Sequence, residues 1–207
     1  MALWTAEDRA RIEGKIRAVE SKTAGEIVVA SVGRADSYAG IRLFYAMLLG
    51  LCGTTLLHGW DPGLPGLWLI ALQLPLTAVG WALLGWPSAM RWIVPAGVRA
   101  RSVHQRALRM FTERSVYATR DHSGVLILLS ELEHRVVILG DRGIHERLRT
   151  QGWQRHVETI VAAIRGGRAA EGVCQVLDAL QVEMAARFPQ RPDDENELSD
   201  AVVDERE

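Results

Sequence analysis

Three carboxylates flank short apolar segments, where a folded chain could bring them together. Glu26 opens one such segment, Asp121 precedes a second, and Asp141 directly follows a third. Carboxylate oxygens are the ligands that hard divalent cations such as Ca²⁺ prefer, and a cation held this way can polarise a phosphate group. We therefore expect these three side chains to form a divalent-cation site. The neighbouring residues expected to contact a bound ligand are Ser123, Gly124 and Arg142.

The same residues have a structural alternative. Asp121 and Ser123 are ordinary turn residues that bond their own backbone, and Asp141 could cap a helix that opens near Arg142. Glu26 could pair with a neighbouring arginine. The sequence has no DxD, HxxxH, GxSxG or P-loop spacing that would favour a particular reaction. A ligand site and a set of structural contacts therefore both remain open.

Other chemistry finds little support. Cys52 and Cys174 lie far apart and form no CxxC motif, which argues against a disulfide framework and a cysteine-based zinc site. The histidines show no ligand spacing. The formal net charge of -1 removes global basicity as an argument for nucleic-acid binding. We expect no nucleic-acid partner.

The apolar segments that carry the carboxylates predict a small mixed sheet. Residues 26–32 form a short apolar, β-branched run typical of a buried strand, residues 125–130 form a second apolar run of this kind, and residues 135–140 form a third. The polar turn Glu131–His134 makes the second and third strands an antiparallel hairpin. A long crossover joins the first two strands, which we expect to be parallel. The start of the first strand, the start of the second and the end of the third would then share one edge.

Apolar residues at helical spacing predict helices on both faces of this sheet. Thr5 and Asp8 form a helix start, followed by a stripe of Ile12, Ile16 and Val19. Further helices are expected near residues 103–119, 144–149, 153–164 and 173–184. The fold class is therefore α/β, with a small mixed sheet sandwiched by helices.

A membrane segment interrupts this unit. Between Arg42 and Arg91 only Asp61 is charged, and residues 58–66 contain the prolines and glycines of a turn. The second half of the stretch reaches the roughly 17 to 25 apolar residues that a spanning helix needs, and the first half is shorter. A hairpin of two transmembrane helices is expected, since a soluble domain of this size has little surface with which to bury both. The lipid bilayer is therefore one partner.

The flanks of the hairpin predict its orientation. Arginines lie on both outer sides, and the connecting loop has neither lysine nor arginine. The positive-inside rule then places both termini and the soluble unit in the cytoplasm, with the protein in the inner cell membrane. The flanking arginines are Arg34, Arg42, Arg91, Arg99, Arg101, Arg106 and Arg109.

Three motifs of the chain resemble the TPM domain family. They are Thr23–Val29, Asp121–Leu128 and Arg135–Ile144. The resemblance extends over most of the soluble part and implies an α/β/α sandwich. It also implies acid phosphatase activity or calcium binding in some members. The hairpin is a departure, because many members carry their anchor at an end of the domain.

Four segments follow from these observations. Residues 1–40 and 91–189 form the two parts of the TPM-like domain, 41–90 form the hairpin, and 190–207 form an acidic tail. From Pro192 onward there are eight acidic residues and one arginine, so we expect a solvated, mobile tail.

Two functions fit this organisation. The first is a cytoplasmic module that binds or assists the assembly of other membrane proteins, and it leaves room for a homo-oligomer. The second is a metal-dependent, acid-phosphatase-like hydrolase using Glu26, Asp121 and Asp141. It would require Ca²⁺ or another divalent cation.

Overall fold

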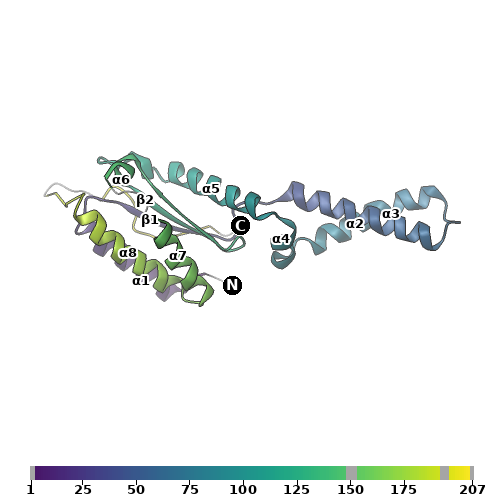
Figure 1. Ribbon diagram of the computed structural model, residues 1–207, viewed down its shortest axis with the longest axis horizontal. Coiled ribbons are helices and arrows are strands. Elements are labelled where there is room, and N and C mark those ends of the chain that lie inside the picture. Colours follow the sequence, from purple (N-terminus) through teal and green to yellow (C-terminus); the bar gives the residue numbers. More distant parts are fainter. Residues whose placement is uncertain (1–2, 148–152, 192–195, 206–207) are drawn as a thin grey trace. The chain divides into compact units, whose positions relative to one another are not determined.

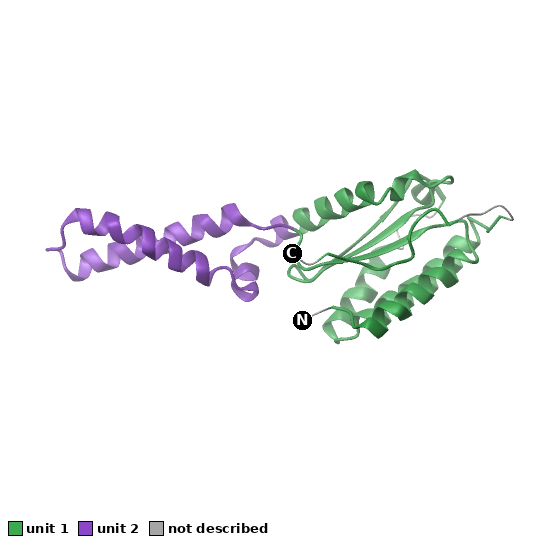
Figure 2. Ribbon diagram, turned by 180° about the vertical axis from the view of Figure 1, so that it is seen from behind, with its two compact units in different colours: residues 1–35, 100–207 green, residues 36–99 purple. Residues whose placement is uncertain are grey.

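The computed structural model describes residues 3–147, 153–191 and 196–205, and the chain divides into two compact units (Figures 1 and 2). One unit contains residues 1–35 and 100–207, and the other contains residues 36–99. The sequence places the interruption at 41–90, a somewhat shorter segment. The soluble unit is therefore assembled from two parts of the chain that are separated by the inserted unit.

The soluble unit is built on a four-stranded sheet in the order β3-β2-β1-β4. The strands are β1 (Ile27–Val32), β2 (Val125–Ser130), β3 (Arg135–Gly140) and β4 (Val203–Glu205). The pairing of β1 with β2 is parallel and that of β2 with β3 is antiparallel, as the sequence predicts. Strand β4 pairs with β1 in parallel.

Helices cover both faces of the sheet, so the predicted fold class is confirmed (Figure 1). On one face lie α1 (Ala6–Glu20), α7 (Trp153–Arg165) and α8 (Ala169–Ala185), and on the other lies α5 (Ala96–Glu113). The capping box of Thr5 and Asp8 that starts α1 is present. A short helix, α6 (Arg142–Arg147), follows β3. The last two residues of the helix predicted at 144–149 lie outside the described residues.

Two cores follow from the alternation of side chains along β1 and β2. Ile27 and Val29 face the core shared with α1, α7 and α8, while Val28 and Ala30 face the core shared with α5. Every residue of β1 and β2 is buried, as expected of strands with helices on both sides. These two strands hold the unit together.

The helix expected to run to Thr119 is wrong at its end. Helix α5 stops at Glu113, and a separate 3-10 turn occupies Val116–Ala118. Between them Ser115 has a φ of 55°, a left-handed backbone that no continuous helix can contain. The break brings Val116 into the core beneath α5.

The mobile tail is also wrong in part. Residues 192–195 lie outside the described residues, but Val203–Glu205 form β4 at the edge of the sheet. Acidic composition alone predicts a solvated segment, and this strand is held by arginines from distant parts of the chain.

The inserted unit contains α2 (Ala39–Trp60), α3 (Gly66–Leu83) and the short α4 (Pro87–Ile93). The sequence did not predict α4. Helix α2 begins before Arg42, which therefore lies in its first turn. Within the described residues, α2 and α3 are long and apolar enough to cross a membrane. Only 17% of the most apolar window of α2 and 6% of that of α3 are buried, so neither is the core helix of a soluble domain.

Small residues mediate the packing of α2 against α3. Ala46, Gly50 and Thr54 recur every four residues and are the buried positions of α2, while Gly80 is the buried position of α3. A Cβ at Gly80 would lie 3.2 Å from the Cα of Ala46. Close backbone approach of this kind is typical of helix pairs in membranes. Gln73 adds an interhelical hydrogen bond to the Met47 carbonyl at 3.2 Å.

Arg42 ties the open ends of the two helices. Its Nε donates to the carbonyl of Trp81 at 2.7 Å, and its guanidinium lies 4.2 Å from the centre of the Trp81 ring. A cation near the last carbonyls of α3 also complements the negative end of the helix dipole.

A disulfide tests the hairpin. A Cβ at Gly80 would lie 3.5 Å from the Cβ of Ala46, which is within the range of natural disulfides. The double variant Ala46→Cys with Gly80→Cys, made in a Cys52→Ser background, should oxidise within one chain, measured as loss of two thiols to maleimide labelling. The matched pair Gly59→Cys with Gly80→Cys should not. Equal labelling of both pairs would contradict the packing.

Candidate functional site at one edge of the sheet

The loops that carry the predicted carboxylates lie side by side. The amide of Val125 donates to the carbonyl of Glu26 at 2.8 Å, and the amide of Asp141 donates to the carbonyl of Gly124 at 2.9 Å. Glu26, Gly124 and Asp141 therefore occupy adjacent positions across β1, β2 and β3. This is the edge that the topology predicts.

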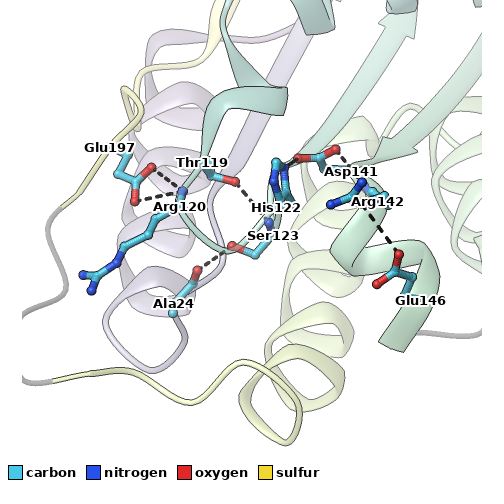
Figure 3. Close-up of polar contacts among 9 residues, drawn as sticks. All are labelled: Ala24, Thr119, Arg120, His122, Ser123, Asp141, Arg142, Glu146 and Glu197. Atoms are coloured by element: carbon cyan, nitrogen blue, oxygen red, sulfur yellow. Dashed lines mark hydrogen bonds and ion pairs between the residues drawn. The ribbon is translucent and has the colours of Figure 1, made fainter.

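Ser123 connects the two chain segments that the hairpin separates (Figure 3). Its hydroxyl donates to the carbonyl of Ala24 at 2.6 Å, and its amide donates to the Thr119 hydroxyl at 3.0 Å. Ser123 and Thr119 are both almost fully buried. The structure thus gives Ser123 a structural partner, and its predicted role in ligand binding stays a prediction.

Glycine is required at two points of this edge. A Cβ at Gly124 would lie 2.1 Å from the carbonyl oxygen of Val116, and one at Gly143 would lie 2.6 Å from that of Asp121. Both contacts are with backbone, which cannot give way as a side chain can. The close approach of these loops explains why small residues occupy both positions.

Asp141 stands at the start of α6. Its Oδ1 accepts a hydrogen bond from the Arg142 amide at 2.6 Å, and its Oδ2 lies 2.9 Å from Nδ1 of His122 (Figure 3). The Arg142 guanidinium lies 3.6 Å from Glu146, and both of these side chains are exposed. Asp141 therefore has structural partners at the start of α6, although it accepts from the adjacent amide and not from the second or third helical amide that a capping side chain engages.

The C-terminal segment crosses the same edge. Asp121 forms an ion pair with Arg191. Glu197 accepts a hydrogen bond from the Arg120 amide at 2.9 Å, and its own amide donates to Oε1 of Glu26 at 3.2 Å. Figure 3 shows Glu197 above Arg120. The role of this segment was not visible in the sequence, because its partners are far away along the chain.

These partners bear on the predicted cation site. Arg191 supplies the positive charge beside Asp121 that a cation would supply, and Asp141 is shared between a backbone amide and His122. Among the residues that the structure describes, no three His, Cys, Asp or Glu side chains form a group that could hold a metal ion. The present arrangement does not fit a shared cation, and the site of Glu26, Asp121 and Asp141 stays a prediction.

An acidic pocket of about 270 Å³ lies beside this edge. It brings together Glu20 at the end of α1, Glu26 before β1 and Asp200 in the C-terminal segment. The remaining lining residues are Arg17, Ser21, Thr23, Gln190 and Asn196. The sequence missed this pocket because it assigned Asp200 to a solvated tail.

Glu20 is the perturbed group of the pocket. Burial, together with the neighbouring charges of Glu26 and Asp200, raises the pKa of Glu20 to about 8, against a weaker opposing effect of its hydrogen bond. Its Oε1 accepts that bond from the Ile27 amide at 3.0 Å. At neutral pH the Glu20 carboxyl therefore holds a proton. The pocket can donate a hydrogen bond as well as accept them.

Cys174 and Trp153 both have packing positions. Cys174 is buried in the core beside α1, and burial raises the pKa of its thiol, so little of the nucleophilic thiolate forms at neutral pH. Trp153 is buried in the same core and covers Gly140, where a Cβ would lie 2.5 Å from the indole.

The contact between Gly124 and Val116 gives a stability prediction. Gly124→Ala should lower the free energy of unfolding by about 3 kcal/mol, because the new methyl group overlaps a backbone carbonyl. Gly14→Ala is the matched control: nothing lies within 4 Å of its Cβ position in α1, so it should leave stability unchanged or raise it. Urea unfolding of the detergent-solubilised chain measures both. Equal midpoints would contradict the close approach.

The raised pKa of Glu20 predicts a pH dependence. The folded chain keeps this proton up to about pH 8, whereas the unfolded chain loses it near the ordinary value of 4.5. Stability therefore falls as pH rises between these values and levels off above them. Glu20→Gln should remove this pH dependence and raise the free energy of unfolding at pH 8 by about 1 to 2 kcal/mol. The expected gain is small because solvent screens a partly exposed group.

Thermal unfolding from pH 4.5 to 9 measures this dependence. The exposed Glu7→Gln on the same helix is the control and should follow the parent chain. Parallel curves for the parent chain and Glu20→Gln would show that Glu20 ionises normally.

Known proteins share this architecture. Residues 93–183 match the sequence model of the TPM domain. The structure is similar to the NMR structure of BA42 protein from the psychrophilic bacterium Bizionia argentinensis sp. nov., with a TM-score of 0.62 and 19% identity. The alignment covers 98% of this chain and 96% of that one, and at this identity it shows the fold alone. No curated protein matches the chain.

The matched region begins at the end of α4 and includes the motifs Asp121–Leu128 and Arg135–Ile144. The resemblance inferred from these motifs is thereby confirmed: residues 93–183 match the TPM domain model, and the chain also has two helices able to span a membrane.

Proposed function

We propose that this protein is a membrane-anchored TPM-domain module that binds other membrane proteins or assists their assembly. The observation that carries the proposal is the position of the hairpin, between β1 and β2 of a single sheet. An anchor at one end of a domain serves only as a tether. An anchor inserted within the domain attaches it at two points of its fold, which suits a module that presents a surface to proteins of the same membrane.

The arginine flanks support a cytoplasmic placement in the inner cell membrane. Arg42 lies in the first turn of α2 and Arg91 in α4, while the loop 61–65 between α2 and α3 has no lysine or arginine. By the positive-inside rule both termini and the TPM domain then face the cytoplasm. Trp60, Trp86 and Trp92 are highly exposed at the ends of these helices, where indole rings favour the headgroup layer.

The contacts at the sheet edge favour binding over hydrolysis. The carboxylates that a metal-assisted phosphatase would use have structural partners, namely Arg191 for Asp121 and the Arg142 amide with His122 for Asp141. A hydrolase would have to break these contacts before it could take up a cation. The family's acid phosphatase activity thus supplies the alternative to be tested.

The proposed orientation in the membrane predicts which parts of the chain an added protease can reach in intact spheroplasts. A cleavable tag inserted at Gly63 should be cut by added protease, and tags at the two termini should be cut only after lysis. Protection of the Gly63 tag with cutting at the termini would reverse the orientation. Recovery of the intact chain in the supernatant after high-speed centrifugation would contradict membrane anchoring.

Binding and hydrolysis are separated by two measurements on the same preparation. Purification in mild detergent should retain specific membrane proteins that a tagged, unrelated two-span protein does not retain. A panel of phosphate esters with and without divalent ions should give no turnover. Turnover abolished by Asp121→Asn and Asp141→Asn would establish the hydrolase instead.

A further inference from the structure

Strand β4 is a minimal addition to the sheet. It pairs with only Ala30–Val32 of β1, whereas β2 pairs with β1 along all six residues. Its three residues are all partly exposed, while every residue of β2 is buried. A short, partly exposed edge strand is the part of a sheet that detaches at the lowest free-energy cost.

Both helical layers contribute arginines that hold this strand. Asp204 pairs with Arg9 of α1, and Glu205 pairs with Arg106 of α5 and with Arg114, the residue that follows α5. The alternation of a strand explains the division, since successive side chains point to opposite faces. The valines follow the same rule: Val202 packs against the core on the α1 side and Val203 against the core on the α5 side.

Two successive hydrogen bonds also hold Asp204 on the α1 side of the sheet. The indole Nε1 of Trp4 donates to the hydroxyl of Ser31 at 2.8 Å, and that hydroxyl donates to Asp204 at 3.0 Å. Trp4 and Ser31 are buried. The edge thus offers a carboxylate at this position a buried hydroxyl donor as well as a guanidinium.

Strand β4 leaves Ile27–Val29 of β1 without a strand partner on this side, within the described residues. A pocket of about 340 Å³ lies between Val28, Arg114 and the segment 198–205. At the other end of β1, the Glu20 carboxyl caps the outward-facing Ile27 amide. The Glu20 side chain and the three residues of β4 thus occupy hydrogen-bonding groups along this edge of β1. A longer strand could replace both, because the main-chain groups of β1 are already aligned for pairing.

We propose that the β1 edge is a docking site for an extended acidic segment of a partner protein, and that residues 200–205 occupy it as an internal stand-in. The partner strand would run parallel to β1, with apolar residues followed by two carboxylates as in the sequence Val202–Glu205. This inference rests on the proposed binding function and names the partner class. Release of the chain's own segment makes the edge available.

A peptide competition experiment tests the inference on the full chain in detergent. The probe is a fluorescent peptide with the sequence of residues 200–205, and its binding is followed by anisotropy. Asp204→Lys with Glu205→Lys releases the internal strand without altering the receiving edge. This variant should bind the probe at least tenfold more tightly than the parent chain, since the internal copy no longer competes.

Further variants test whether Arg106 and Arg114 bind the carboxylates of the probe. Adding Arg106→Glu and Arg114→Glu to the released variant should weaken binding at least tenfold, and so should higher salt. A scrambled peptide of the same composition should bind weakly throughout. Val203→Pro provides a second release that leaves the charges unchanged, because proline lacks the N–H that a strand contributes. Circular dichroism verifies that each variant is folded.

The outcomes separate this inference from the proposed function. Equal affinity of the parent chain and both released variants, or equal binding of the scrambled peptide, would overturn the docking site even if membrane proteins co-purify with the chain. Tight, sequence-dependent binding of the probe without any co-purifying protein would uphold the docking site and count against the wider binding function.

Discussion

The parallel pairing of β1 with β2 is the interaction on which the rest of the structure depends, because it joins the segments on either side of the inserted hairpin. All six residues of each strand take part, from Ile27 with Val125 to Val32 with Ser130. Both strands are buried on both faces, so each contributes to two cores. Without this ladder α1 and β1 would be covalently attached to the domain but not part of it.

The pairing of β1 with β2 also determines the polar contacts of the loops that precede these strands. Because the loops before β1 and β2 must meet, Ser123 bonds to Ala24 and Gly124 contacts the Val116 carbonyl. The polar residues there satisfy backbone groups that the meeting of the loops would otherwise leave buried and unbonded. This geometry engages the hydroxyl and the amide of Ser123 in contacts between the loops.

Sequence patterns identify those parts of the fold whose cause is local. The β-branched runs predict β1, β2 and β3, and the long uncharged stretch predicts α2 and α3, since burial and lipid both select composition directly. The edge that collects Glu26, Asp121 and Asp141 also follows, because strand order and direction fix which loops are neighbours. Their partners do not follow, since side-chain pairing depends on elements distant in sequence.

Two features that the sequence did not predict also depend on residues that are distant along the chain. Strand β4 has three residues and an acidic composition, and its partners lie far away along the chain: β1 pairs with it, and Arg9, Arg106 and Arg114 neutralise its carboxylates. Burial is the main cause of the raised pKa of Glu20, and the charges of Glu26 and of Asp200, which returns beside α1 from far along the chain, add to it. The end of α5 depends on one left-handed residue, Ser115, whose type gives no warning of it.

Hydrogen exchange of the full-length protein in detergent tests the central claim most directly. If β1 and β2 form one cooperative ladder, the amides of Ile27–Val32 and Val125–Ser130 should exchange together, with the same slow rate as global unfolding. Fast exchange in Ile27–Val32, at the rate of an unstructured peptide, while Val125–Ser130 stays protected would show that the two parts of the chain do not share a sheet.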